Sequence, residues 1–121
     1  NMFNVNTLRN LFFPKKKEKE ESYLYSEAKY RDIVEHSLVG VYIIQDDSFK
    51  YVNKKFCEIF GYAYQEIVNK ISPESLVFES DKNIVKENIK KRISGESTSI
   101  EYEFRGVKKD GSIVWIKVLG N

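Results

Sequence analysis

The stretch that decides the fold covers residues 40–61 and reads GVYIIQDDSFKYVNKKFCEIFG. Two apolar runs, at 39–44 and 49–52, flank an Asp-Asp-Ser turn and predict two short strands. Asn53 can accept hydrogen bonds from the free N–H groups at a helix start, and Gly61 is suited to end that helix in the left-handed conformation. We therefore expect a strand, a turn, a second strand and a capped helix in close succession.

Downstream of this stretch we expect short helices and one longer helix. A brief helix at 64–68 is followed by a start signal in which Ser72 can cap and Pro73 takes the first helical position. The longest helix spans 81–93, where apolar residues recur four apart. We expect its lysines to face outward: Lys82, Lys86, Lys90 and Lys91.

The C-terminal part of the chain predicts a β-hairpin. Apolar and charged residues alternate over 100–105, which is typical of a half-buried strand. The Asp110-Gly111 pair is a strong hairpin turn signal, and the returning strand is expected at 113–119.

The N-terminal part differs in composition from the rest, and we treat residues 1–21 as an extension or linker. Apolar residues recur there at helical spacing, at Val5, Leu8, Leu11 and Phe12. Pro14 ends this pattern, and a run of mixed charge follows. This segment is too short for us to favour a membrane-surface contact through it. Residues 22–37 predict a helix that leads into the domain proper, 22–121.

Composition excludes several classes of protein. The chain has 121 residues, 41% of them hydrophobic, a net charge of +2, and a single Cys and His, Cys57 and His36. One Cys cannot form an internal disulfide, and this pair cannot complete a structural zinc site without carboxylates. No apolar run approaches the ~20 residues that span a bilayer, and no secretory leader is visible, so we expect a cytoplasmic protein. The mildly basic balance argues against a dedicated nucleic-acid surface.

No catalytic constellation is visible either. His36 has no nucleophile at a strained turn to serve, and no glycine-rich phosphate loop is present. We therefore assign no catalysis and no metal site to these residues; enzymatic activity would belong to an effector domain elsewhere.

The order and spacing of five pieces resemble the PAS family of sensor domains, over about residues 30–120. The pieces are GVYIIQD at 40–46, FKYVN at 49–53, FCEIFGY at 56–62, EIV at 66–68 and KDGSIVW at 109–115. The resemblance implies an α+β fold: a five-stranded antiparallel sheet with short helices and one longer helix on one face, enclosing a small pocket.

One departure from the family concerns the middle of the sheet. The family's fifth strand follows the hairpin and pairs between the first and fourth strands, whereas this sequence reaches Asn121 without it. An empty slot would leave two rows of unpaired backbone groups. We favour a sequence that ends before its last strand; the alternatives are that residues 2–5 or a partner chain fill the slot.

The resemblance also allows the family's cofactors to be checked by residue type. Flavin-binding light sensors use a Cys on the helix after the short one, but residues 73–78 contain none, and Cys57 is expected to pack in the core. Haem-binding members use a His on the long helix, and residues 81–93 contain none. Carboxylate-binding relatives use cationic groups in the pocket, whereas the lysines here are expected to face out. A cofactor stays unknown, none being favoured, and a non-covalently held flavin stays open.

What remains is an apolar pocket that either fills itself, as cores do, or holds a small apolar or amphipathic ligand. Tyr102 is our choice for a ligand-orienting group because it combines an inner-face position with a polar tip. The candidate lining residues are Val41, Ile43, Phe56, Ile59, Ile67, Ile71, Leu76, Val85, Ile89, Tyr102, Phe104, Ile116 and Val118.

We therefore expect a sensory module of a signal-transduction protein, the input domain of a histidine kinase or similar regulator. Ligand or partner binding would bias one packing of sheet and helices and pass that bias to the effector. The alternative is a ligand-free dimerisation module with a self-filled core.

A homodimer is also expected, because Ile113 and Trp115 share a face that needs a cover if it points away from the pocket. The same argument applies to the face shared by Tyr42 and Ile44. The cover would be the 22–37 helix, of the same chain or a second copy. The proposed contacts join Tyr23, Leu24, Tyr30 and Ile33 to Ile44, Ile113 and Trp115.

Overall fold

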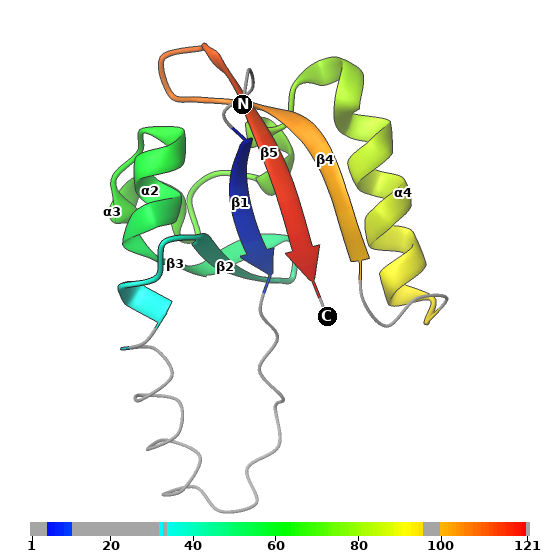
Figure 1. Cartoon of the computed structure of the whole chain (residues 1–121), viewed down its shortest axis with the longest axis horizontal. Helices are drawn as coiled ribbons and strands as arrows, with labels where there is room; N and C mark the ends of the chain where they lie inside the picture. Colours follow the sequence, from blue (N-terminus) through cyan, green and yellow to red (C-terminus); the bar gives the residue numbers. More distant parts are fainter. Residues whose placement is uncertain (1–4, 11–31, 33, 96–99, 121) are drawn as a thin grey trace, which may run out of the picture.

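The computed structural model describes residues 5–10, 32, 34–95 and 100–120. Five strands form one sheet in the order β3-β2-β1-β5-β4 (Figure 1). Their bounds are β1 Val5–Asn10, β2 Gly40–Gln45, β3 Ser48–Val52, β4 Ile100–Val107 and β5 Ile113–Gly120. The two predicted strand pairs, β2 with β3 and β4 with β5, are confirmed as antiparallel ladders.

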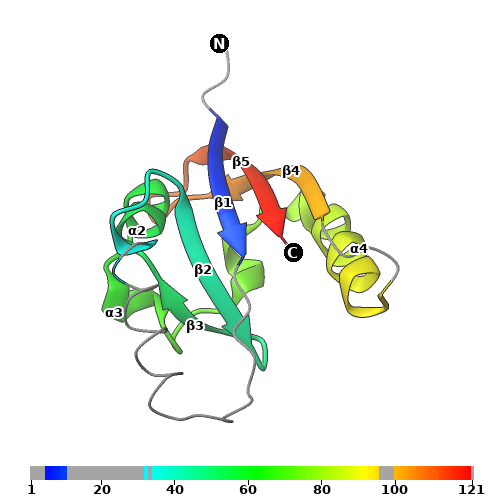
Figure 2. The ribbon, with the colours of Figure 1, turned by 60° about the horizontal axis from the view of Figure 1, so that its bottom comes forward.

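The helices lie near the two edges of the sheet. Their bounds are α2 Lys54–Phe60, α3 Tyr64–Ile67, the 3₁₀ turns η1 Pro73–Leu76 and η2 Glu79–Asp81, and α4 Lys82–Ile93. α2 and α3 lie beside β2 and β3, whereas α4 runs alongside β4 (Figure 2). Among the described residues, no helix is long and apolar enough to cross a membrane.

The central strand β1 corrects two expectations. The helical spacing of residues 5–12 predicts a helix, yet Val5–Asn10 is a strand that pairs in parallel with both β2 and β5. It fills the slot that we expected to be empty, and it makes the sheet mixed rather than antiparallel. The physical reason is that β2 and β5 would otherwise leave N–H and C=O groups unpaired on both sides of the slot. The hydrogen bonds that an extended segment makes with them outweigh a weak local helix signal.

Leu8 anchors β1 in the core. It is 3% exposed and sits between Gly40 of β2 and Val118 of β5 in the ladder. A Cβ at Gly40 would stand 2.7 Å from the Leu8 Cδ2 atom, so the glycine leaves the space that the leucine occupies. The slot is therefore shaped for this side chain.

A bulge sets which side chains of the first hairpin face inward. The register joins Ile43 to Tyr51 but Ile44 to Phe49, which leaves Lys50 as the extra residue. Phe49 consequently lies in the main core, while Tyr51 lies on the outer face.

The expected phase of β2 was wrong by one residue. Tyr42 and Ile44 pack with the main core, whereas Val41 and Ile43 pack with Val34 on the outer face. Because this strand is apolar at nearly every position, its sequence carries no alternation from which the inward face could be read.

Asn53 caps α2 as predicted and also ties three segments together. Its Oδ1 accepts from the Phe56 and Val41 N–H groups at 3.0 and 2.8 Å, and its Nδ2 donates to the carbonyls of Val34 and Val39 at 2.7 and 3.0 Å. The side chain is fully buried, and all four of its hydrogen-bonding positions are used. Gly61 ends the helix with a φ of +80°, also as predicted.

The leading helix predicted at 22–37 falls mostly outside the described residues, as do Tyr23, Leu24, Tyr30 and Ile33. Within the described part, Val34 and Glu35 are helical. Val34 covers part of the outer face, and the Glu35 carboxylate accepts from the Tyr51 hydroxyl at 2.7 Å.

Candidate functional site

The candidate site is a groove of about 720 Å³ between the inner face of the sheet and α4. A volume of this size lies within the range of small-molecule sites. Its floor is apolar and draws on β1, β2, β3, α2, η1 and β4. The floor residues are Leu8, Tyr42, Ile44, Phe49, Phe56, Phe60, Leu76, Val77 and Phe104.

Aromatic rings make one side of the floor rigid. The Phe56 ring lies 5.6 Å from Tyr42, 5.3 Å from Phe49 and 4.9 Å from Phe60, measured between centroids. Tyr42 is buried and hydrogen-bonded to the Asn10 side chain. Burial raises the pKa of its hydroxyl, which therefore stays neutral. This side of the groove is a preformed surface, because the Phe56 ring contacts all three of the others and Tyr42 also contacts Phe49.

The α4 wall is much less buried than the floor. Val85, Ile89 and Ile93 line the groove, yet Ile89 is 43% exposed and Ile93 is 81% exposed. No residue of α4 is fully buried. Apolar surface that faces the groove is therefore still in contact with water.

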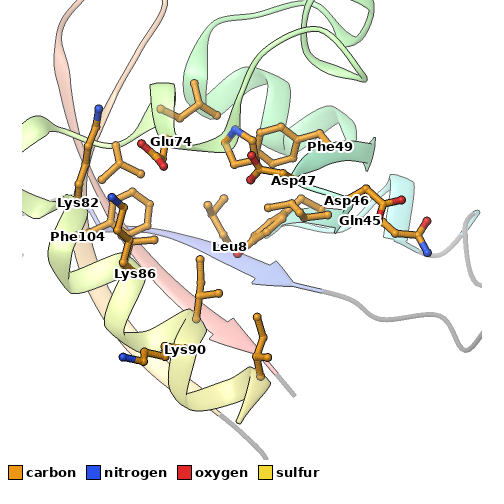
Figure 3. A pocket seen from close by; sticks show the side chains of 18 of the residues that line it. Leu8, Gln45, Asp46, Asp47, Phe49, Glu74, Lys82, Lys86, Lys90 and Phe104 are labelled. Carbon is orange, nitrogen blue, oxygen red and sulfur yellow. The ribbon is translucent and has the colours of Figure 1, made fainter.

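The rim of the groove is charged on both sides. Lys82, Lys86 and Lys90 project from α4, and Glu74 lies across from them near the turn that holds Asp46 and Asp47 (Figure 3). Lys86 and Lys90 are exposed, as expected for lysines that face outward, and all three border the groove. Each of these lysines lies next to the apolar stripe of α4. Its aliphatic stem can therefore extend along the groove while its ammonium group reaches water.

Five of the thirteen predicted lining residues line this groove: Phe56, Leu76, Val85, Ile89 and Phe104. Others pack in the main core without reaching the groove: Ile59, Ile67, Ile71, Ile116 and Val118. Val41 and Ile43 lie on the opposite face of the sheet.

Tyr102, our choice for a ligand-orienting group, does not line the groove. It packs against the core beside Phe104, with 6.2 Å between ring centroids, and burial raises its pKa to about 12. The sequence pattern missed Leu8, Tyr42 and Phe49 as lining residues. The bulge decides the face of Phe49 and the central strand that of Leu8, and neither feature has a local signal. The face of Tyr42 has none either, because β2 is apolar at nearly every position.

The remaining chemistry-bearing residues lie away from the groove. Burial raises the pKa of the Cys57 thiol, which packs against the core. His36 donates from Nδ1 to the Asp32 carbonyl, 3.0 Å away, on the exposed end of a helical turn. In the described ranges no three His, Cys, Asp or Glu side chains gather as metal ligands.

Comparisons with known proteins match this fold. A family model described as the PAS fold matches residues 49–121. A domain of a sensory box sensor histidine kinase/response regulator from Geobacter sulfurreducens is 18% identical, with a TM-score of 0.64 over 84% of this chain and 85% of that one. No curated protein matched.

Two further solved structures are similar. The PAS domain of a LuxR-family transcriptional regulator from Burkholderia thailandensis, in complex with ethanol, is 19% identical, with a TM-score of 0.61 over 71% of this chain and 75% of that one. The PAS domain of an HTR-like protein from Haloarcula marismortui is 22% identical, with a TM-score of 0.56 over 86% of this chain and 84% of that one. At these identities the likeness concerns the fold alone.

Proposed function

This chain belongs to the PAS family, and from that premise we propose that it is a cytoplasmic sensory module of a signal-transduction protein. It takes a small ligand in the groove between α4 and the sheet and passes a conformational bias to an effector. A histidine kinase, a diguanylate cyclase or a transcription regulator would be such an effector. No catalytic role is proposed for its own residues.

The observation that carries the proposal is the groove itself. A core that fills itself leaves no space of about 720 Å³ beside exposed Ile89 and Ile93 side chains. The groove therefore favours a ligand-binding module over the alternative of a self-filled interaction module.

The proposed mechanism is a shift between positions of α4. The start of the helix is tied to β4, and its far end exposes apolar side chains toward the groove. A ligand that contacts both the floor and this wall binds better when the wall is close. Ligand binding therefore favours the arrangement in which α4 lies close to the sheet, and the difference in affinity sets the size of the shift.

The test is a titration with decanol, a neutral apolar alcohol, followed by methyl NMR. Shifts are expected at Leu8, Val85 and Ile89, and none at Ile43 on the other face. A Val85→Trp variant fills the groove and should lose the response, whereas Val107→Trp, on the outer part of β4, should keep it. Circular dichroism checks that both variants fold. Absence of saturable shifts at the groove, or equal binding by the Val85→Trp variant, would overturn the proposal.

Dimerisation is a second role, favoured by the outer face of β5. Ile113 and Trp115 are 43% and 38% exposed there, in a sheet whose other outer half is covered by Val34 and Val39. We propose a second copy of this chain as the partner, with the N-terminal helix of our earlier expectation as part of the contact. Ile44 takes no part, because it faces the groove. Sedimentation of the wild type and of Trp115→Glu tests this: a dimer that the substitution dissociates supports it, and a monomeric wild type refutes it.

A further inference from the structure

The row of lysines on the groove rim points to the chemistry of the ligand. We infer that the groove selects a single-chain amphiphile with an anionic head, such as a fatty-acid carboxylate, whose head lies against Lys86 and Lys90. The inference rests on the proposed ligand-binding function and adds the charge of the head group to it.

The spacing of the lysines matches the apolar wall. Lys82, Lys86 and Lys90 are four residues apart on α4, so they form one stripe about 12 Å long. Val85, Ile89 and Ile93 form a parallel stripe one residue away, and all of these residues line the groove. An elongated ligand along α4 would therefore contact apolar side chains over its length, with ammonium groups beside it at the rim.

The charge of α4 favours an anion. The helix holds five cationic residues and a single acidic one, Glu87. Lys82 is partly neutralised by Glu79, with Nζ 3.2 Å from Oε1. For Lys86 and Lys90, by contrast, the part of the chain that the structure describes offers no carboxylate within ion-pair distance. These two ammonium groups are thus available to a ligand.

The opposite rim sets the orientation. Asp46 and Asp47 are exposed on the β2–β3 turn, and Glu74 is exposed on η1. Their carboxylates repel an anionic head, which leaves the α4 side as its favourable position. They would attract a cationic head instead, so a cationic amphiphile is the direct competitor.

The tail follows from the exposed apolar surface. Ile89 and Ile93 face the groove with large exposed fractions, and Leu8, Phe56 and Phe104 form the floor opposite them. An alkyl chain removes both surfaces from water at once. A small hydrophilic anion would leave them wet, so decanoate should bind far more tightly than butyrate.

The experiment compares three probes that share one alkyl chain and differ in the head: decanoate, decanol and decylammonium. Each is titrated into the full chain by calorimetry, below its micelle or solubility limit, at two salt concentrations. The expected order is decanoate tightest and decylammonium weakest, with the advantage of decanoate shrinking at high salt.

Matched variants locate the head. The double variant Lys86→Gln/Lys90→Gln should weaken decanoate binding roughly four- to 25-fold, from about two- to fivefold per exposed charge pair, and leave decanol unchanged. The control Lys54→Gln/Lys91→Gln removes the same charge from positions off the groove and should change neither probe.

The outcomes separate this inference from the proposed function. Equal binding of decanol and decanoate, or tighter binding of decylammonium, overturns the anionic head and leaves a ligand-binding groove. Equal losses of decanoate affinity in the two double variants overturn the placement at Lys86 and Lys90. Absence of binding by all three probes overturns both proposals.

Discussion

Asp81 and Arg105 form a three-bond junction between the start of α4 and the middle of β4. The Asp81 carboxylate accepts from the Arg105 backbone N–H at 2.7 Å, from Nε at 3.0 Å and from the terminal guanidinium nitrogen at 2.7 Å. The same guanidinium stacks on Phe78, 4.8 Å from the ring centroid. The first turn of α4 is thus fixed to the sheet, while exposure along its groove face reaches 81% at Ile93. These contacts anchor the start of the groove wall to the sheet.

Replacing Asp81 by Asn should destabilise the fold. The variant loses the charge and at least one of the three hydrogen bonds, which costs on the order of 2 kcal/mol of unfolding free energy at neutral pH. Urea unfolding measures this. Glu79→Gln, on the same turn, removes a solvent-exposed carboxylate that pairs with Lys82, and it should change stability by less than about 0.5 kcal/mol.

The same junction predicts part of the acid sensitivity. The hydrogen bonds from Arg105 hold the pKa of Asp81 below its usual value. The unfolded chain recovers an ordinary pKa of about 3.9, so the junction stabilises the fold above that pH and loses this contribution as pH falls through the lowered pKa. The unfolding free energy of Asp81→Asn should therefore fall less steeply than that of the wild type as the pH is lowered. Parallel acid limbs in the two proteins would contradict the assignment.

Truncating Leu8 tests the central strand. Leu8→Ala should cost about 2–5 kcal/mol, because the side chain is buried against Gly40 and Val118 neighbours. Thr7→Ala, one residue away on the other face of β1, should cost less than about 1 kcal/mol. If residues 5–10 were only a linker, both substitutions would leave the midpoint of chemical unfolding unchanged.

Asn53 should tolerate no charge. In Asn53→Asp the cap oxygen remains, but the two donors to the Val34 and Val39 carbonyls are lost and a carboxylate is buried beside them. We expect a loss of about 3 kcal/mol or more at neutral pH, with partial recovery as acid protonates the new side chain. Thermal melts at several pH values measure this. An Asn53→Asp variant that is as stable as the wild type would contradict the buried network.

The exposed end of α4 should matter for binding and not for stability. Ile93→Ser removes an apolar side chain that is largely in water, so the unfolding free energy should change by less than about 0.5 kcal/mol. The affinity for decanol should nevertheless fall, because the ligand loses part of its wall. Unchanged affinity would show that the ligand does not reach this end of the helix.

Local signals in the sequence predict most of the individual elements. Asn53, Gly61 and the Ser72-Pro73 start act where the pattern places them, because caps and turns depend on residues that are neighbours in the chain. The Asp110-Gly111 turn likewise joins β4 to β5, with Asp110 accepting from the Ser112 N–H at 2.9 Å. These signals also carry the resemblance to the family.

The central strand and the inward face of β2 depend on distant residues, and their prediction failed. Leu8 is in a strand because β2 and β5 stand on both sides of it, more than thirty positions along the chain. The all-apolar run of β2 does not indicate that Tyr42 lines the groove, and no local signal marks the Lys50 bulge that turns Phe49 inward. That Lys86 and Lys90 border the groove depends on where α4 lies against the sheet, which the helix's own sequence does not state.

The measurement that tests the central claim most directly is amide hydrogen exchange of α4 with and without saturating decanol. If a ligand in the groove draws the helix toward the sheet, exchange should slow from Val85 to Ile93, most at the far end, with little change near the Asp81 junction. Exchange that stays the same along α4 while decanol is bound would contradict the account.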